Sequence, residues 1–360
     1  MAAAAGRSDV EVLALYLPQF HPIVENDEWW EPGFTEWTNL AAARRLFVGH
    51  RRPDLPGELG FYDLRVPEVR ERQAGLARDH GVTGFCWWHY WFAGRRLLER
   101  PFDEVLAAGT PTLPFSLCWA NQSWSGVWHG APDRVLIEQT YPDGDDAAHF
   151  AALLPAFRDD RYHRVDGRPL LSVFRPQELP DAPRFVETWQ RLAAESGLGG
   201  LYLVAFCESR AWGSQYETHD ADGFDAAVHV EFPFHRTAMT KVRDRLRTSI
   251  EIAGPGRYRY SRDLPSYPRA LRGVVHPCVY PNWDNTPRSS RRGSVIVDAD
   301  PARFERHVRQ AADRAALNPV GQRLVFVKSW NEWAEGNHLE PDRVHRRGWL
   351  DALASGLAPR

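Results

Sequence analysis

The sequence predicts an α/β protein: a (β/α)8 TIM-like barrel in a single domain, with elaborated loops at the C-terminal face. Three observations lead to this prediction. Short apolar runs recur along the chain, helix-like segments separate many of them, and polar or aromatic clusters follow most of them. A doubly wound fold is the weaker alternative, because LYLPQFHP follows the first apolar run where a glycine-rich phosphate loop would stand. We expect one domain over residues 1–360, with residues 1–10 disordered.

Eight apolar runs are candidate strands, because nearly continuous hydrophobicity is typical of parallel strands buried on both faces. In chain order they are Val12–Tyr16, Gly84–Trp88, Leu113–Cys118, Leu170–Phe174, Leu201–Phe206, Ala226–Val230, Pro277–Tyr280 and Leu324–Lys328. The candidate helices are Glu68–Asp79, Leu97–Ala108, Asp145–Phe157, Pro183–Ser196 and Pro301–Ala316. Because proline suits the first helical turn, the second helix should begin near Pro101. The irregular, aromatic stretch Gly254–Pro268 is interpreted as a long loop over the barrel mouth.

Composition and charge argue against several kinds of partner. The net charge of −3 and the lack of a long basic run argue against nucleic acid. Asp9 and Glu11 interrupt the first apolar stretch, and no apolar window reaches the length of a membrane span. We therefore predict no signal peptide, no membrane span and a cytoplasmic location. The four cysteines are far apart and are expected to be buried, reduced thiols and not zinc ligands: Cys86, Cys118, Cys207 and Cys278.

Polar and aromatic residues follow six of the candidate strands, at the end where such barrels collect their catalytic side chains. These clusters are Tyr16–His21, Trp87–Trp91, Trp119–Gln122, His229–Glu231, Tyr280–Asp284 and Trp330–Glu335. The chain also has 15 tryptophans, and indole rings stack well on the apolar face of a pyranose. A sugar site is therefore favoured, with a tryptophan-rich core as the structural alternative.

Two carboxylates stand out in the segment Ser329–Pro341, which reads SWNEWAEGNHLEP. Glu332 and Glu335 lie within one short turn, where they repel each other unless protonation or a substrate separates them. Cleavage or transfer of a glycosidic bond uses such a pair, one as proton donor and one as nucleophile or base. Burial beside Trp330 and Trp333 would raise one pKa and create the acid. We therefore predict Glu332 and Glu335 to be the catalytic residues.

Sixteen further residues are expected to bind the substrate. They are Tyr16, His21, Glu36, Trp88, His89, Trp119, Asn121, Gln122, His229, Glu231, Tyr280, Trp283, Asp284, Trp330, Asn331 and Trp333. Several have structural alternatives when taken singly. His21 and His89 suit hydrogen-bonded core histidines, Asp284 suits a turn cap, and Trp119 suits a plug in the barrel core. No cluster of histidine, cysteine and aspartate has metal-ligand spacing, so no metal is predicted.

Three stretches together resemble a known family. LYLPQFHPIVENDEWWEPGFTEWTNL, CWAN and SWNEWAEGNHLEP resemble the WbsX-like glycosyltransferases, which are similar to glycoside hydrolase family 99 of endo-α-mannosidases and endo-α-mannanases. The resemblance spans nearly the whole chain and implies a (β/α)8 barrel without a cofactor. It also implies a retaining mechanism through a 1,2-anhydro sugar. Glu332 would then be the base that engages the substrate's 2-hydroxyl, and Glu335 the general acid and then base.

The chain departs from the family pattern at two acidic positions. The middle motif usually reads Trp-Ala-Asn-Glu followed by Trp-Asp-Gly, whereas Gln122 and His129 stand at its acidic positions here. Both are expected to face the pocket, so mannan specificity is not carried over to this chain.

The leading hypothesis is a retaining, endo-acting glycoside hydrolase with an oligosaccharide or polysaccharide substrate. The first alternative is a glycosyltransferase or transglycosidase that builds a cell-surface polysaccharide, and the second is an inactive sugar-binding barrel. A transferase using a nucleotide sugar would need a diphosphate site. The DxD stretches 143–145 and 220–222 are interpreted as loop or helix-capping residues, which weakens that alternative.

Overall fold

The computed structural model describes residues 9–51, 54–126, 131–208, 216–234, 254–260 and 271–359. Eight parallel strands form the barrel: β1 (Glu11–Tyr16), β2 (Gly84–Phe92), β4 (Phe115–Trp119), β8 (Arg168–Val173), β9 (Tyr202–Glu208), β10 (Ala226–Val230), β12 (Val274–Val279) and β14 (Leu324–Val327). Strand β1 closes the ring, because Leu13 lies opposite Gly84 of β2 on one side and Phe326 of β14 on the other. The predicted (β/α)8 barrel is confirmed.

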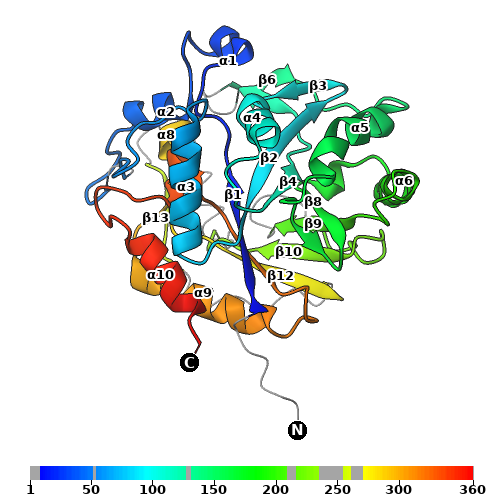
Figure 1. Cartoon of the computed structure of the whole chain (residues 1–360). Helices are drawn as coiled ribbons and strands as arrows, with labels where there is room; N and C mark the ends of the chain where they lie inside the picture. Colours follow the sequence, from blue (N-terminus) through cyan, green and yellow to red (C-terminus); the bar gives the residue numbers. More distant parts are fainter. Residues whose placement is uncertain are drawn as a thin grey trace.

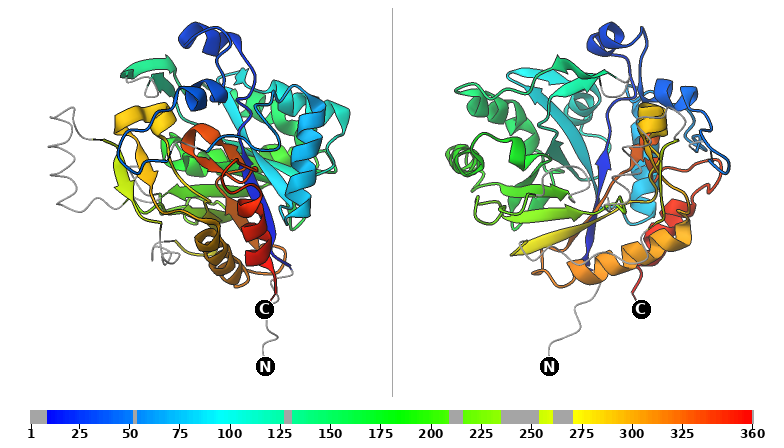
Figure 2. Two further views of the ribbon diagram at one scale, coloured as in Figure 1. Left: turned by 90° about the vertical axis from the view of Figure 1, so that its left-hand side faces the viewer. Right: turned by 180° about the vertical axis from the view of Figure 1, so that it is seen from behind.

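Helices cover the outside of the barrel (Figures 1 and 2). They are α3 (Pro67–Asp79), α4 (Arg100–Ala108), α5 (Asp145–Phe157), α6 (Ala182–Glu195), α9 (Pro301–Ala315) and α10 (Gly348–Leu357). Helices α6 and α9 begin in the same way, with a proline in the first turn and an aspartate before it. Asp181 accepts a hydrogen bond from the Arg184 amide at 3.0 Å, and Asp300 accepts one from the Arg303 amide at 2.9 Å. These side chains satisfy amides that the first helical turn leaves open.

The predicted strands and helices agree with the observed ranges to within a few residues, and β2 differs most; α10 was not predicted. It continues past Trp88 to Phe92 because an antiparallel partner, β3 (Arg95–Leu97), pairs with its last residues. The extension carries Tyr90 and Trp91 beyond the barrel rim. The predicted loop 254–268 is corrected in part, since β11 (Gly256–Tyr258) pairs in parallel with β13 (Ser294–Ile296). Residues 261–268, like residues 1–8 and His129, lie outside the described part of the chain.

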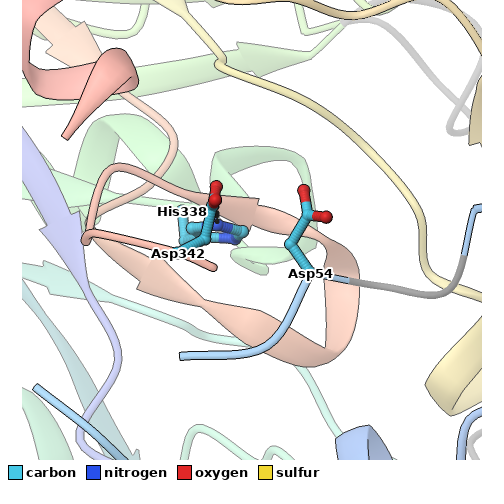
Figure 3. A group of neighbouring side chains, drawn as sticks. All are labelled: Asp54, His338 and Asp342. Atoms are coloured by element: carbon cyan, nitrogen blue, oxygen red, sulfur yellow. Dashed lines mark hydrogen bonds and ion pairs between the residues drawn. The ribbon is translucent and has the colours of Figure 1, made fainter. Parts of the chain in front are cut away.

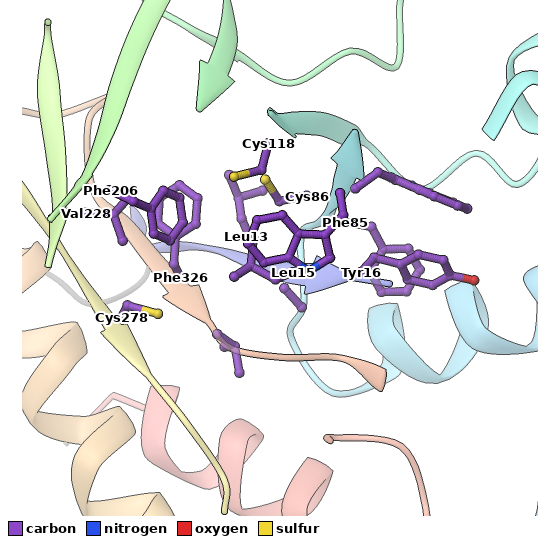
Figure 4. Close-up of a cluster of buried hydrophobic side chains, with 14 of the residues drawn as sticks. Leu13, Leu15, Tyr16, Phe85, Cys86, Cys118, Phe206, Val228, Cys278 and Phe326 are labelled. Atoms are coloured by element: carbon purple, nitrogen blue, oxygen red, sulfur yellow. The ribbon is translucent and has the colours of Figure 1, made fainter. Parts of the chain in front are cut away.

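Buried apolar side chains pack together on the barrel strands (Figure 4). Phe206 of β9 contacts Phe326 of β14 with ring centroids 5.7 Å apart. Both rings are fully buried, as is Leu13 of β1. All four cysteines are buried and free, as the sequence predicted. A packed core of this kind holds the strand ends in fixed positions, and such barrels collect their functional side chains at the C-terminal ends of the strands.

Several short elements gather at the end of the molecule opposite the C-terminus (Figures 1 and 2). They are α1 (Val24–Trp29), α2 (Glu36–Ala42), α8 (Thr286–Ser289) and the hairpin β5 (Trp124–Gly126) with β6 (Ala131–Ile137). The segment 329–341 adds β15 (Asn331–Glu332), the 3-10 helix η6 (Trp333–Glu335) and β16 (Asn337–His338). Helices α2 and α8 both pack against η6. Among the helices that the structure describes, none combines the length and the apolar character required to cross a bilayer.

Candidate active site

A cavity of about 280 Å³ opens at the C-terminal ends of the strands. Residues at or just beyond the ends of β4, β8, β9 and β14 line it: Ala120, Phe174, Glu208 and Lys328. Trp88 and Tyr90 line it from β2, and Glu332 and Glu335 line it from the segment after β14. Five residues expected from the sequence therefore share this cavity: Trp88, Gln122, Trp283, Glu332 and Glu335.

A tight turn carries the two glutamates into the cavity. Strands β15 and β16 pair in antiparallel fashion, with Asn331 opposite His338, and η6 lies between them. The turn ends at Gly336, whose φ of 59° lies in the left-handed region. A side chain there would also collide with Asp284, because a Cβ atom on Gly336 would lie 2.9 Å from the Cβ atom of Asp284. The Asp284 amide donates to the Glu335 carbonyl at 2.6 Å, which ties this turn to the loop that follows β12.

One buried guanidinium joins three carboxylates. Arg288 of α8 donates from Nη1 to Glu335 Oε1 at 2.6 Å and from Nη2 to Glu332 Oε2 at 3.0 Å. Its Nη2 also donates to both oxygens of Glu36, at 2.8 and 2.9 Å. Glu332 accepts a second hydrogen bond on Oε1 from the Trp88 indole at 3.0 Å. Donors therefore hold both oxygens of Glu332, which fixes its carboxylate as an acceptor at the cavity wall.

The two glutamates of the turn have different electrostatic settings. Burial, followed by the neighbouring charge of Glu332, raises the pKa of Glu335 to about 7, although Arg288 and Lys328 oppose this shift. The Glu335 side chain is still 16% exposed, compared with 6% for Glu332. Glu335 can therefore carry a proton near neutral pH and release it into the cavity, as a general acid requires. Burial also raises the pKa of Glu36, which is completely enclosed beneath the pair.

Several expected binding residues point away from the cavity because side chains alternate along a strand. On β2, Trp88 and Tyr90 line the cavity, whereas His89 lies 2.8 Å from His149 of α5, between the two ring Nε2 atoms. Trp119, the last residue of β4, stacks edge-on against the same His149 ring. Tyr16 and Tyr280 also face the outer layer, where Tyr16 donates to Gln73 of α3 and Tyr280 lies against His307 of α9.

Other expected residues lie around the cavity without lining it. Asn121 braces Arg175, since it accepts from the Arg175 amide at 2.7 Å and donates to the Arg175 carbonyl at 2.8 Å. Asn331 holds the backbone of Leu17 in the same way, because it accepts from the Leu17 amide at 2.7 Å and donates to the Leu17 carbonyl at 3.0 Å. Asp284 accepts from the Thr286 hydroxyl and lies 2.9 Å from His50 Nε2, which matches the turn-capping alternative.

The indoles of Trp330 and Trp333 both donate to Glu340, and neither residue lines the cavity. His21 and His229 are buried away from it, and Glu231 lies 4.0 Å from His229.

Sequence reasoning missed several cavity residues, and only some of them had a signal. Tyr90 stands inside the recognised cluster Trp87–Trp91, and Lys328 ends a predicted strand. Glu208 extends β9 two residues past its predicted end, and Arg175 follows the end of β8. Arg288 had no signal, because it lies in a short helix within a stretch of arginines and serines. The other cavity residues that were not predicted are Leu17, Trp30, Ala120, Ser123, Trp124, Ser125, Leu136 and Phe174.

A cluster of possible metal ligands lies outside this cavity. Ligand atoms of Asp54, His338 and Asp342 lie within 4.8 Å of one another (Figure 3). Asp342 is already used as an acceptor, because its oxygens accept from the amides of Val344 and His345 and from the Trp349 indole at 3.0 Å. This pattern is that of an aspartate that closes a turn and anchors α10. The cluster therefore has a structural explanation and supports no metal assignment.

Comparison with known proteins identifies the family. The profile described as "Glycosyltransferase WbsX" matches residues 12–353. The chain belongs to this family. Two proteins named "Uncharacterized protein WxcX", from two strains of Xanthomonas campestris pv. campestris, are each 41% identical to the chain over 353 residues. The match covers 96% of this chain and 49% of each relative, so the chain spans about half the length of the curated relatives it matches. The WbsX family is one of carbohydrate-active enzymes.

Solved structures share the barrel at low sequence identity. A "Glycoside hydrolase-like protein" is similar with a TM-score of 0.62 and 14% identity, over 97% of this chain and 94% of that chain. The family 99 endo-α-mannosidase from Bacteroides thetaiotaomicron, in complex with bis-tris-propane, is similar with a TM-score of 0.58 and 12% identity, over 96% of both chains. Identities this low show a common fold alone.

Proposed function

We propose that this WbsX-family chain cleaves glycosidic bonds inside an oligosaccharide or polysaccharide, with retention of anomeric configuration. One observation carries the proposal. Two glutamates of one turn share an aromatic cavity, where the pKa of Glu335 is raised to about 7 and donors hold both oxygens of Glu332. The pair therefore consists of one group suited to give up a proton and one suited to accept a hydrogen bond from the substrate.

In the first step, Glu332 takes the proton of the sugar's 2-hydroxyl while O2 attacks the anomeric carbon. The bond from that carbon to the leaving oxygen breaks, and Glu335 gives its proton to this oxygen. The product is a 1,2-anhydro sugar. Arg288 contacts both carboxylates, so it compensates their negative charge as it moves from Glu332 to Glu335.

In the second step, Glu335, now ionised, takes a proton from a water molecule that attacks the anomeric carbon. The bond from this carbon to O2 opens, and Glu332 returns its proton to O2. Two inversions at one carbon give net retention, and both glutamates return to their starting protonation states.

Aromatic walls support a sugar ligand. Trp30, Trp88, Tyr90, Trp124, Phe174 and Trp283 all line the cavity, and Tyr90 contacts Trp124 of the β5–β6 hairpin with ring centroids 5.0 Å apart. Ring faces of this kind stack on the apolar faces of pyranoses and exclude water from the bond that breaks. Gln122 also lines the cavity, so the departure from the family pattern at this position lies where it can affect sugar choice.

Transfer to a second sugar is the other candidate function, and the family description favours it. The same anhydro sugar would then be opened by a hydroxyl of an acceptor glycan, with Glu335 taking that proton. An inactive sugar-binding barrel is the third candidate, and the arrangement of Glu332, Glu335 and Arg288 argues against it.

Product analysis tests the proposal and separates the candidates. The chain is incubated with a panel of α-linked oligosaccharides in H₂¹⁸O, and products are followed by mass spectrometry. Hydrolysis gives shortened products with ¹⁸O at the new reducing end, whereas transfer gives lengthened products without it. Glu332→Gln and Glu335→Gln should both lose this activity and still bind the substrate. The exposed Glu71→Gln of α3 is the matched control and should keep it. Full activity in both cavity variants would contradict the assignment.

A donor that lacks the 2-hydroxyl tests the anhydro route directly. Such a donor has no O2 to attack the anomeric carbon, so the wild-type chain should not turn it over. Normal turnover of the 2-deoxy donor would contradict the route, and Glu332 would then be assigned as a direct nucleophile.

A further inference from the structure

The floor of the cavity holds a lysine that the proposed mechanism does not use. Lys328 directly follows β14, and its amide donates to the Val279 carbonyl at 2.8 Å. The side chain is only 7% exposed and lines the cavity. Its Nζ lies 5.1 Å from the ring centre of Phe174, 5.6 Å from that of Trp88 and 5.9 Å from that of Trp283. The ammonium is therefore enclosed by rings from β2, from the end of β8 and from the loop after β12.

Lys328 differs from the two other cations of the cavity in its contacts. Arg288 joins three glutamates, and Arg175 lies 2.9 Å from Glu208. Within the described part of the chain, no oxygen lies within ion-pair or hydrogen-bond distance of Lys328 Nζ. The carboxylates of Glu335, Glu208 and Glu332 outweigh burial and raise the pKa of Lys328, so its amine stays charged. Its N–H donors are left facing the cavity, where a ligand oxygen would satisfy them.

Lysine is rare in this chain, so a lysine in the cavity stands out. Of the 44 lysine and arginine residues, only Lys241 and Lys328 are lysines. A chain that otherwise uses arginine almost everywhere has a lysine at the centre of its cavity floor. An ammonium is a compact charge with three donors, whereas a guanidinium is a larger planar fork suited to carboxylates. The compact ammonium lies near the rings of both Trp88 and Trp283, at the wall of the cavity that they line together.

We propose that Lys328 and Glu208 together bind a hydroxyl group of the sugar and so select an uncharged sugar in the cavity. Lys328 donates a hydrogen bond to the hydroxyl oxygen, and the same hydroxyl donates to Glu208, the last residue of β9. Arg175 forms an ion pair with Glu208 at 2.9 Å and so holds this carboxylate in place. This inference rests on the proposed function only in taking the ligand to be a sugar, and it adds a specificity-determining pair that is separate from Glu332 and Glu335.

An uncharged hydroxyl suits this position better than a sugar carboxylate does. Three carboxylates already act on Lys328, and a uronate would bring a further negative charge among them. A hydroxyl adds no charge and can serve as acceptor and donor at once, which Lys328 and Glu208 require in combination.

Binding measurements with a fixed set of probes test the pair. The probes are the methyl α- and β-hexopyranosides of glucose, galactose and mannose, their 3-, 4- and 6-deoxy analogues, and the matching uronides. Dissociation constants are measured from tryptophan fluorescence. The parent sugars should bind more tightly than the uronides. Lys328→Met and Glu208→Gln should each weaken binding of the preferred sugar on the order of 10-fold. One deoxy position should cost the wild type a similar factor and cost Lys328→Met nothing further.

Three outcomes would overturn the proposal. Lys328→Met could bind the preferred sugar as tightly as the wild type does. Every deoxy analogue could lose the same factor in both proteins, which would make Lys328 a structural residue only. A uronide could bind most tightly and lose that advantage in Lys328→Met, which would assign the position to a carboxylate.

A second measurement uses the wild-type chain and does not depend on folding of the variants. Labelling with ¹³Cε-lysine gives two lysine signals, and Lys241→Arg identifies the one from Lys328. The Lys328 signal should shift when the preferred methyl glycoside is added. An unchanged Lys328 signal at saturation would overturn the proposal. Turnover is measured separately, because a chain that binds glycosides through Lys328 without cleaving them would overturn the proposed function and leave this inference standing.

Discussion

Two glutamates of the segment 329–341 have the same raised pKa and opposite surroundings. Burial raises the pKa of Glu335 and of Glu340 to about 7 in each case. Glu335 faces the cavity and is 16% exposed. Glu340 is completely enclosed and accepts four hydrogen bonds, from the Tyr62 hydroxyl at 2.8 Å, Gln73 Nε2 at 2.6 Å, and the indoles of Trp330 at 2.9 Å and Trp333 at 2.6 Å.

The difference shows that a raised pKa does not by itself mark a catalytic acid. Glu340 does not line the cavity, so it cannot give its proton to a bound ligand. Its carboxylate instead holds the indoles of Trp330 and Trp333, which lie on either side of Glu332 in the sequence. Glu335 has the same proton affinity but an open side, so its proton can reach a bound molecule. One glutamate positions the turn, and the other is the proposed acid.

The largest expected effect separates the two residues by activity. Glu335→Gln should lower kcat on an unactivated glycoside by about 10² to 10⁴, because a positioned acid contributes on that order. An activated aryl glycoside needs little protonation, so it should restore part of the rate. Steady-state kinetics on both substrates measures this. If Glu335→Gln kept the full rate on the unactivated glycoside, Glu335 would not be the general acid.

The next effect separates them by stability. Glu340→Ala leaves four buried donors without an acceptor, so the free energy of unfolding should fall by at least about 3 kcal/mol. Denaturation in urea measures this. Glu340→Gln keeps the shape and one acceptor oxygen and should lose less. Glu71→Ala on the exposed face of α3 is the control and should stay within about 0.5 kcal/mol of the wild type. A Glu340→Ala variant as stable as this control would show that the four hydrogen bonds do not anchor the turn.

Titration should separate the two residues again, with a smaller effect. Both carboxyl groups bind their proton more tightly in the folded chain than at the ordinary value of 4.5, so each contributes stability below pH 4.5 that is lost as pH rises through about 7. The wild type should therefore lose part of its stability advantage over Glu340→Gln between pH 4.5 and 7. The rate should fall above about pH 7, where Glu335 ionises, and this fall should persist in Glu340→Gln and be absent in Glu335→Gln. A fall in rate above pH 7 that is absent in Glu340→Gln and present in Glu335→Gln would contradict the assignment of Glu335 as the acid.

Removal of divalent metal ions by a chelator should not change the reaction rate. The proposed proton transfers need only Glu332 and Glu335, and Asp342 already uses its oxygens within its own turn. Incubation with EDTA should therefore leave the rate unchanged. Loss of activity in EDTA that Mg²⁺ or Mn²⁺ restores would favour a transferase with a metal-dependent donor site.

The comparison also shows how far the sequence could predict the site. Trp88 and His89 are neighbours in one aromatic cluster, and the sequence predicted both as binding residues. Only Trp88 lines the cavity, because the two side chains point to opposite faces of β2. A pattern of unusual residues at a strand end locates the rim of a barrel, but it does not show which residue of the cluster faces inward.

Some partners could not be predicted at all. Glu340 lies in the quoted segment, but its donors Tyr62 and Gln73 come from residues more than 260 positions away in the chain. Arg288 contacts Glu36 across 252 positions and Glu332 across 44. No local period or spacing links residues at such separations.

The sequence by itself determined the barrel, because apolar runs that alternate with helical segments can bury their surfaces in few other ways. It also predicted a candidate site at the C-terminal ends of the strands, where the cavity opens, and it singled out Glu332 and Glu335 as a pair. Only the tertiary structure decided that Arg288 joins them, that Glu340 anchors their turn and that Lys328 faces the cavity with no acceptor among the residues that the structure describes. The physical reason is that strand patterns follow from short-range backbone geometry and hydrophobicity, whereas the charge balance of a buried cavity depends on distances between side chains that only the closed barrel brings together.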